Sequence, residues 1–255
     1  MNIVFMGTPE FSLPTLHKLY KSDHNIQLVV TQPDRPKGRG RESTPPPVKE
    51  FALEKKIPTL QPKKCTSLEV VKTLGELNSD VFIVVAFGQI LDKNLLTLPR
   101  HFCINLHSSL LPKYRGAAPI NWAIINGETK TGVTTMKMDT GLDTGNILLS
   151  SKVSISDADD AQSLHETLAH KGSSLVLETL RQLDSGLLEP ICQNSDLASY
   201  APKLKKEDGL IQWNQPAIKI HNLVRGLMPW PGAFSFLESK RFKICKTEIK
   251  RCDSI

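Results

Sequence analysis

The sequence lacks the features that mark secreted, membrane-spanning or zinc-knuckle proteins. Its five cysteines are odd in number, widely scattered and never paired as C-x-x-C, which argues against a disulfide framework or a zinc site. No apolar run approaches the roughly 18 residues of a membrane helix. The N-terminus also lacks the basic start and long apolar stretch of a signal peptide. We therefore expect a cytoplasmic monomer that needs no metal and contacts no membrane.

A dinucleotide-binding fingerprint is missing as well. The first apolar run ends in Gly7-Thr8-Pro9 and contains no G-x-G-x-x-G, which weakens the case for a nucleotide-cofactor oxidoreductase. The chain does contain 40% apolar residues among its 255, enough to bury a core. This length fits one large domain, or one domain with a partial second.

Short apolar runs alternate with helical patterns along the first part of the chain. Residues 2–6, 27–31, 81–86 and 102–107 are typical of strands, and residues 66–69 look like a capping box that starts a helix. The same patterns predict further helices and strands at residues 119–126, 131–138, 147–155 and 160–183. The alternation predicts an α/β fold with a doubly wound, mostly parallel sheet, whose ligands bind beyond the carboxyl ends of the strands.

The last part of the chain differs from the rest in pattern and in charge. Residues 203–209 are polar and predict a linker. The patterns after it predict a strand at 210–213, a helix from Pro216, and strands at 233–237 and 241–245. A remainder of about 50 residues lies near the lower limit for an independent core. We therefore expect residues 1–202 to form the main domain, and residues 210–255 to be an incomplete, β-rich second domain.

Positive charge is concentrated in this last part. Residues 203–255 contain 11 Lys and Arg against five Asp and Glu, whereas the other 202 residues carry 21 of each sign. Such asymmetry favours a polyanionic partner, commonly nucleic acid. A basic surface that only aids solubility explains it equally well.

A second basic segment lies at residues 31–47, a 17-residue connection with five prolines and no predicted secondary structure. Its basic residues are Arg35, Lys37, Arg39 and Arg41. Loops of this length without secondary structure are commonly functional or disordered. Basic residues interleaved with glycine would let a finger order against a phosphate backbone, and a disordered, solvated insertion is the alternative.

The strand at residues 102–107 carries two polar side chains on one face. Alternation places Asn105 and His107 together, because successive side chains point to opposite faces of a strand. An Asn amide can donate a hydrogen bond to an oxygen that becomes negative, and a His can take a proton from an amine nucleophile. A satisfied polar pair at the end of a strand is the structural alternative.

Two carboxylates follow in a glycine-interrupted loop at residues 138–146. Asp139 or Asp143 could reach His107 and fix its tautomer and orientation. Asp139 also fits a tight Asp-Gly turn. The pattern alone leaves the choice between the two open.

Two loops have the composition of a ligand-binding wall. Residues 108–116 directly follow the Asn/His strand and would leave Leu110 and Leu111 in solvent unless these line a pocket. Residues 87–91 form a second semi-apolar loop with free backbone groups. Together the two loops could hold a flat heterocycle, and ordinary loop packing is the alternative for each.

The combination of these segments resembles the methionyl-tRNA formyltransferase family. The matching stretches are MGTPEFS at 6–12, TQPDRPKGRGR at 31–41, AFGQIL at 86–91, INLHSSLLPKYRGAAPINWAIINGE at 104–128 and TGVTTMKMDTGLDTGNIL at 131–148. The resemblance implies a Rossmann-like formyltransferase catalytic domain over residues 1–202. It also implies a basic tRNA-binding domain that starts within residues 210–255 and is cut short.

The resemblance further implies which residues form the site. Asn105, His107 and Asp143 match the catalytic positions, which selects Asp143 over Asp139. The formyl-tetrahydrofolate-binding motif matches Ser109, Leu110, Leu111 and Pro112. To this cofactor site we add the second loop, Phe87, Gly88, Gln89, Ile90 and Leu91. The expected tRNA contacts are Arg35, Lys37, Arg39 and Arg41.

The implied reaction moves the formyl group of 10-formyltetrahydrofolate to the α-amino group of methionine on charged initiator tRNA, in translation initiation. We expect Asn105 and protonated His107 to stabilise the oxyanion of the tetrahedral intermediate, and Asp143 to orient His107 and relay protons. Two further functions remain open besides the oxidoreductase. One is a folate-dependent formyltransferase for a small amine such as an amino sugar nucleotide, and the other is a non-catalytic RNA-binding module.

Overall fold

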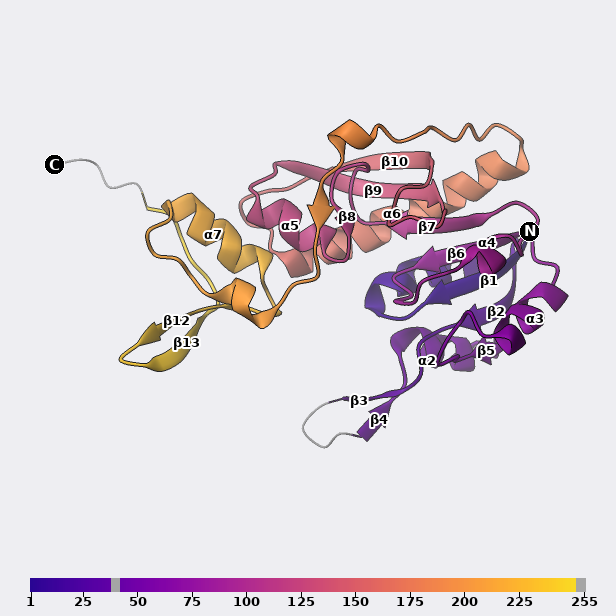
Figure 1. The fold of residues 1–255 in the computed structure, drawn as a ribbon, viewed down its shortest axis with the longest axis horizontal. Coiled ribbons are helices and arrows are strands. Elements are labelled where there is room, and N and C mark those ends of the chain that lie inside the picture. Colours follow the sequence, from indigo (N-terminus) through magenta and orange to yellow (C-terminus); the bar gives the residue numbers. More distant parts are fainter. Residues whose placement is uncertain (38–41, 251–255) are drawn as a thin grey trace.

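The computed structural model describes residues 1–37 and 42–250, and its centre is a seven-stranded sheet (Figure 1). The strands of this sheet are β1 (Asn2–Gly7), β2 (Asn25–Val30), β5 (Thr59–Leu60), β6 (Val81–Val85), β7 (Cys103–His107), β9 (Lys130–Lys137) and β10 (Ile147–Ser154). They lie in the order β10-β9-β7-β6-β1-β2-β5. The five strands from β7 to β5 run parallel, while β9 and β10 pair antiparallel. The predicted α/β fold with a mostly parallel sheet is confirmed.

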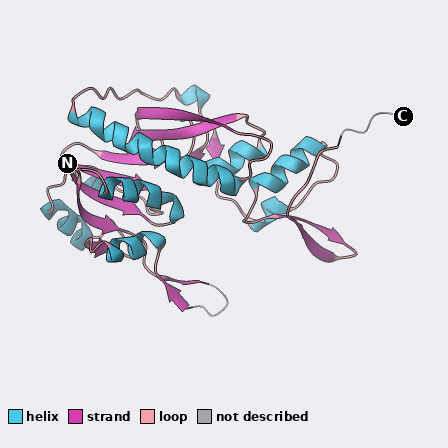
Figure 2. Ribbon diagram, turned by 180° about the vertical axis from the view of Figure 1, so that it is seen from behind, coloured by secondary structure: helices cyan, strands magenta, loops and turns pink. Residues whose placement is uncertain are grey.

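Helices cover both faces of this sheet (Figure 2). They are α1 (Leu13–Tyr20), α2 (Pro47–Glu54), α3 (Leu68–Glu76), α4 (Lys93–Leu96), α5 (Pro119–Ile125) and α6 (Ala161–Asp184), and the short 3₁₀ turn η1 (Glu10–Ser12) precedes α1. Alternate residues of β1 face opposite layers: Ile3 and Phe5 pack with α1, α2, α5 and α6, whereas Val4 and Met6 pack with α3 and α4. A central strand must be apolar on both sides when both faces are covered, which explains its continuous apolar run.

Helix α6 has the best-formed N-terminus of these helices. The Asp160 carboxylate accepts hydrogen bonds from the backbone N–H groups of Gln162 (3.0 Å) and Ser163 (2.9 Å), and the Ser163 hydroxyl accepts from the Asp160 N–H. The capping box predicted at residues 66–69 is wrong, because Ser67 caps α3 without any side-chain hydrogen bond. The burial of Val70 and Leu74 against the sheet stabilises α3 instead.

The connection at residues 31–47, predicted to lack secondary structure, carries an antiparallel hairpin of β3 (Arg35–Lys37) and β4 (Glu42–Thr44), and α2 begins at its last residue. The base of the hairpin is fixed through Asp34, which accepts hydrogen bonds from Gln61 Nε2 (2.6 Å) and Lys49 Nζ (2.7 Å). The Gln61 hydrogen bond, and then the Lys49 ammonium, lower the pKa of Asp34 below its ordinary value. These bonds position the start of the hairpin on the body of the domain.

After α6 the chain crosses back to pair β11 (Tyr200–Ala201) with β8 (Arg115–Gly116). It then forms a 3₁₀ turn η3 (Lys206–Gly209), helix α7 (Ala217–Gly226) and a hairpin of β12 (Ala233–Leu237) and β13 (Lys240–Ile244). The strand predicted at 210–213 is absent from this described part: Leu210 makes one isolated bridge with Phe234. The side chain of Trp213 is largely exposed and donates to Ser235 Oγ (2.8 Å), so no alternating buried face forms there.

Helix α7 packs on α5, and the β12–β13 hairpin extends away from the sheet (Figure 1). Asn121 of α5 donates to the carbonyl of Gly226 (2.8 Å), and Arg225 donates to the carbonyls of Ser156 (2.7 Å) and Asp159 (3.0 Å). The division of the chain at residues 203–209 stays a prediction.

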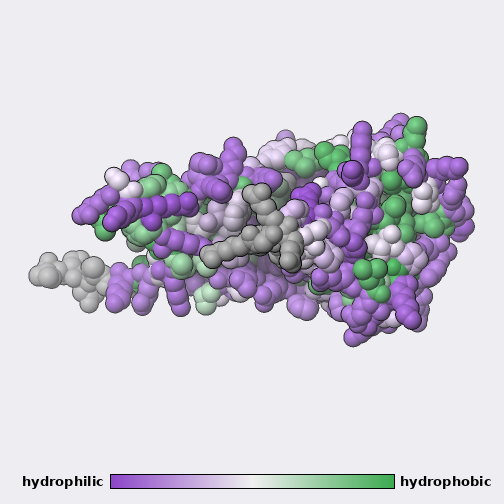
Figure 3. Space-filling view, turned by 90° about the horizontal axis from the view of Figure 1, so that it is seen from below, coloured by the Kyte–Doolittle hydropathy of each residue, from purple (hydrophilic) through white to green (hydrophobic). Residues whose placement is uncertain are grey.

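Among residues 1–37 and 42–250, no helix has both the length and the apolar composition needed to span a bilayer. Figure 3 shows hydrophilic residues over most of the face seen from below, with apolar residues in separate patches.

Candidate active site

A cavity of about 700 Å³ opens beyond the carboxyl ends of β6 and β7. Its wall contains three of the predicted segments: the loop at 87–91, the end of β7, and the loop at 139–143 between β9 and β10. The first two follow parallel strands, so the cavity lies where ligands bind in this class of sheet. Residues from η1, α5 and α6 complete the wall; among them are Phe11, Ile120, Asn121 and His165.

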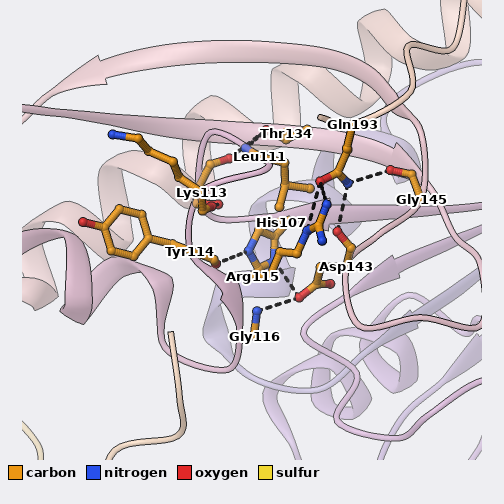
Figure 4. Close-up of polar contacts among 11 residues, drawn as sticks. His107, Leu111, Lys113, Tyr114, Arg115, Gly116, Thr134, Asp143, Gly145 and Gln193 are labelled. Atoms are coloured by element: carbon orange, nitrogen blue, oxygen red, sulfur yellow. Dashed lines mark hydrogen bonds and ion pairs between the residues drawn. The ribbon is translucent and has the colours of Figure 1, made fainter. Parts of the chain in front are cut away.

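Asn105 and His107 lie on this wall, as the alternation along β7 predicts. The side-chain amide of Asn105 makes no hydrogen bond with any residue in the described part of the chain. His107 is nearly buried, and its Nε2 lies 2.9 Å from the carbonyl oxygen of Tyr114 (Figure 4). A carbonyl oxygen only accepts, so Nε2 carries a proton. Nδ1 is therefore the nitrogen of this ring that is left to exchange one.

The loop between β9 and β10 brings Asp143, and not Asp139, to His107. Asp143 Oδ2 lies 3.8 Å from His107 Nδ1 and accepts a 2.8 Å hydrogen bond from the backbone N–H of Gly116. Asp139 instead accepts from the Gly141 N–H (3.0 Å) and the Thr144 hydroxyl (2.8 Å), which closes the turn. This is the tight-turn role that the sequence offered as an alternative for Asp139.

The sequence predicts that Asp143 orients the His107 ring, but no hydrogen bond joins the two side chains. A separation of 3.8 Å between Asp143 Oδ2 and His107 Nδ1 is too long for a hydrogen bond. Asp143 Oδ2 is turned toward the backbone N–H of Gly116. The hydrogen bond that orients the ring is the one from Nε2 to the Tyr114 carbonyl. The Asp143 carboxyl group nevertheless lies beside Nδ1.

The segment Ser109 to Pro112 does not line the cavity, contrary to the expectation for Leu110 and Leu111. It is attached to β9 through Thr134, whose hydroxyl donates to the Ser109 carbonyl (2.7 Å) and accepts from the Leu111 N–H (3.2 Å). Leu111 is buried without a ligand, and Leu110, which is partly exposed, packs over Gly132 of β9. The segment thereby fixes the next residues, including those that contact His107 and Asp143.

The second loop, Phe87 to Leu91, does line the cavity. The Gln89 side chain is already engaged: it accepts from the Cys65 N–H (2.7 Å) and donates to the Pro62 carbonyl (2.9 Å). Phe87 and Leu91 are buried, whereas Ile90 is 87% exposed. Gly88 has a φ of +82°, a conformation that glycine adopts readily. The groups this loop presents to a ligand are therefore backbone atoms and the Ile90 side chain.

The predicted tRNA contacts are only partly described. Arg35 is exposed at the base of the hairpin, and its Nη2 donates to Gln32 Oε1 (3.1 Å). Gln32 in turn donates to the carbonyl of Phe87 (3.2 Å) on the cavity wall. Lys37 lies in β3, and the predicted contacts Arg39 and Arg41 lie outside the described residues. A short chain of hydrogen bonds thus connects the hairpin to the cavity.

Sequence reasoning missed the residues that hold His107 and Asp143 in place. The backbone groups of Tyr114 and Gly116 contact them directly, and the side chains of Arg115 and Gln193 lie next to them (Figure 4). Gly116 has a φ of +115°, and a Cβ there would meet the Ala201 carbonyl oxygen at 2.8 Å. Its place after a Pro-containing loop is a signal that could have found it, but nothing in the local sequence marks Gln193.

The match to a family profile places this fold and site in the class of formyl transferases. The family profile described as formyl transferase matches residues 1–180, and the profile of the formyl transferase C-terminal domain matches residues 203–254. The solved N-formyltransferase from Helicobacter canadensis, in complex with folinic acid and dTDP-3-aminofucose, superposes with a TM-score of 0.73 at 21% identity, over 96% of this chain and 86% of that one. At that identity the likeness shows the shared fold.

The sequence relatives are more specific. The methionyl-tRNA formyltransferase of Geobacter metallireducens is 55% identical over 249 residues, which are 98% of this chain and 80% of the relative. That of Caldanaerobacter subterraneus subsp. tengcongensis is 52% identical over 250 residues, 98% of this chain and 81% of the relative. The chain belongs to the methionyl-tRNA formyltransferase family, and the resemblance found in the sequence is confirmed.

Proposed function

We propose that this chain transfers the formyl group of 10-formyltetrahydrofolate to the α-amino group of methionine on charged initiator tRNA. The observation that carries the proposal is the meeting of Asn105, His107 and Asp143 around one cavity, in a chain of this family. An amide without another partner among the described residues, an imidazole whose Nε2 donates to the Tyr114 carbonyl, and a carboxyl group beside the Nδ1 of that imidazole suit acyl transfer to an amine.

The cavity wall fits a folate. Ile90 and Leu142 both line the cavity with most of their side-chain surface exposed, at 87% and 62%. Covering exposed apolar side chains in a concave site with a flat ring lowers the free energy of the complex, because apolar surface is removed from water. Backbone groups near Gly88 supply the polar contacts that orient such a ring.

When bound, the folate supplies the formyl carbon and the leaving N10. As the methionine amine attacks that carbon, the formyl oxygen gains negative charge, and the unengaged Asn105 amide donates a hydrogen bond to it. His107 Nδ1 takes the proton that the amine loses, and the charge of Asp143 stabilises the resulting imidazolium. The same proton passes from Nδ1 to N10, so no net proton is lost or gained.

The proposal is tested by supplying the folate donor with three acceptors: charged initiator tRNA, free methionine and an amino sugar nucleotide. We expect rapid formylation of the charged tRNA alone, because the basic hairpin and basic C-terminal part would serve no small acceptor. Preferential use of the sugar nucleotide would favour the small-amine enzyme. Binding of tRNA without any transfer would favour the non-catalytic RNA-binding module.

Arg35→Ala is expected to weaken use of the charged tRNA in a salt-dependent way. Arg35 is exposed at the base of the hairpin, where one phosphate contact would be lost. Removing one such contact lowers the slope of log affinity against log salt by about one. The measurement is KM for charged tRNA between low and moderate salt, with Lys72→Ala, an exposed Lys on α3, as the control. A salt slope equal to that of the unaltered protein would remove Arg35 from the tRNA site.

A further inference from the structure

One buried side chain connects the two loops that meet at the active site. Gln193 lies in the segment after α6, is 8% exposed and makes four hydrogen bonds (Figure 4). Its Oε1 accepts from Arg115 Nε (3.1 Å) and Nη2 (2.8 Å), and its Nε2 donates to the carbonyls of Asp143 (2.9 Å) and Gly145 (2.7 Å). Neither Gln193 nor Arg115 lines the cavity.

The direction of the Gln193 amide follows from the chemistry of its partners. A guanidinium only donates and a backbone carbonyl only accepts, so the amide oxygen must face Arg115 and the amide nitrogen must face the loop. In the part of the chain that the structure describes, the Arg115 guanidinium pairs with no carboxylate. Among the described residues the guanidinium of Arg115 donates to Gln193, which fixes the end of the Gln193 amide that points toward Asp143.

The loop that receives these bonds has a backbone that needs support. Asp143 has a φ of +53°, which is an uncommon conformation for a residue with a Cβ. The Gln193 bonds hold the carbonyls of Asp143 and Gly145, on both sides of Thr144. Gly116, next in the chain to Arg115, donates to the Asp143 carboxylate. Gln193 thus holds the backbone of Asp143, and Gly116 holds its side chain.

We infer that Gln193, oriented by Arg115, is a positioning residue: it keeps the Asp143 carboxylate beside His107 Nδ1 so that the imidazole can pass the proton from amine to N10. This inference rests on the proposed function. Because Gln193 acts through Asp143, its loss lowers the rate of transfer more than the affinity for folate: it loosens the loop that carries Leu142 and leaves the wall at 87–91 in place. A misplacement of about 1 Å at a reacting group can cost about a hundredfold in rate.

Gln193→Glu keeps the contact with Arg115 and removes the hydrogen bonds to the loop carbonyls. The new carboxylate still accepts from Arg115, and even forms an ion pair with it, but it presents oxygen to two carbonyl oxygens and cannot hold them. We expect kcat to fall by about a hundredfold and folate affinity to fall by a smaller factor, because Leu142 lies in the loosened loop whereas Ile90 stays in place. Gln193→Met loses the same two donors and also leaves Arg115 unpaired, so we expect a similar kcat with a lower melting temperature.

Gln27→Glu is the matched control, because Gln27 also donates to a backbone carbonyl, that of Leu77 (2.9 Å), far from the cavity. It should leave kcat unchanged. A fall of kcat and folate affinity by the same factor in Gln193→Glu, or a kcat within about twofold of the unaltered protein, would overturn the inference.

Hydrogen exchange separates failure of this inference from failure of the proposed function. In Gln193→Glu the amides of residues 139–146 should exchange faster than in the unaltered protein and in Gln27→Glu, whatever the acceptor proves to be. If the unaltered protein formylates no charged tRNA, the proposed function fails. Faster exchange in Gln193→Glu would still show that Gln193 holds the loop at residues 139–146. Unchanged exchange rejects that role by itself.

Discussion

Asn105→Ala is expected to lower kcat for formyl transfer by about a hundredfold to a thousandfold, which is the typical effect of removing one oxyanion donor. The Asn105 amide lies on the cavity wall and has no other partner among the described residues, so its hydrogen bonds are free for a reacting oxygen. Since the charge on that oxygen develops only during reaction, KM should change little. Single-turnover rates with saturating folate and charged tRNA measure the effect directly.

Two further variants make this test specific. Asn105→Asp keeps the shape of the side chain but replaces the donor with a negative oxygen, and should be at least as inactive as the alanine variant. Asn25→Ala removes an exposed Asn on β2 whose side chain donates to Asn2 Oδ1 (2.9 Å), and should retain full activity. A kcat within tenfold of the unaltered protein for Asn105→Ala would take the oxyanion role away from this residue.

The parts of the fold that the sequence predicts well are those whose pattern is local. The apolar run of β1 must be buried on both sides of a covered sheet, and the period of α6 places Leu164, Leu168 and Leu175 on one buried face. Asn105 and His107 share a face because strand alternation leaves no other arrangement. Each of these conclusions needs only neighbouring residues.

The elements that escape prediction depend on contacts between distant residues. The hairpin of β3 and β4 is attached at Asp34 by Gln61 and Lys49, neither of which lies in the connection between Thr31 and α2 that suggested a loop. Residues 210–213 have the composition of a strand, but only Leu210 finds a partner, Phe234. A strand-like composition allows a segment to form a strand, but a strand forms only where a neighbouring segment pairs with it.

The same distinction holds within the active site. Which carboxylate approaches His107 depends on Gly116 and Gln193, which lie 27 and 50 residues from Asp143 in the chain. The spacing of Asp139 and Asp143 contains no information about these contacts. The family resemblance selected Asp143, a choice that the local pattern alone left open.

His107→Ala is expected to lose a hundredfold to ten-thousandfold in kcat, the usual contribution of a general base. The Nε2 proton is held by the Tyr114 carbonyl, so only Nδ1 can take the proton from the attacking amine. His107→Gln can keep a donor toward Tyr114 but offers no base of suitable strength, and we expect it to be equally slow. Folate affinity should be retained in both variants, because Ile90 and Gly88 are unchanged.

Added imidazole provides the decisive control, since the space left in His107→Ala can admit it near Asp143. We expect partial recovery of the transfer rate in His107→Ala and no recovery in His107→Gln, where the side chain still fills the site. Recovery should rise with the concentration of the neutral base, because that form accepts the proton. An alanine variant that transfers formyl at the unaltered rate without imidazole would leave proton transfer to a group other than His107.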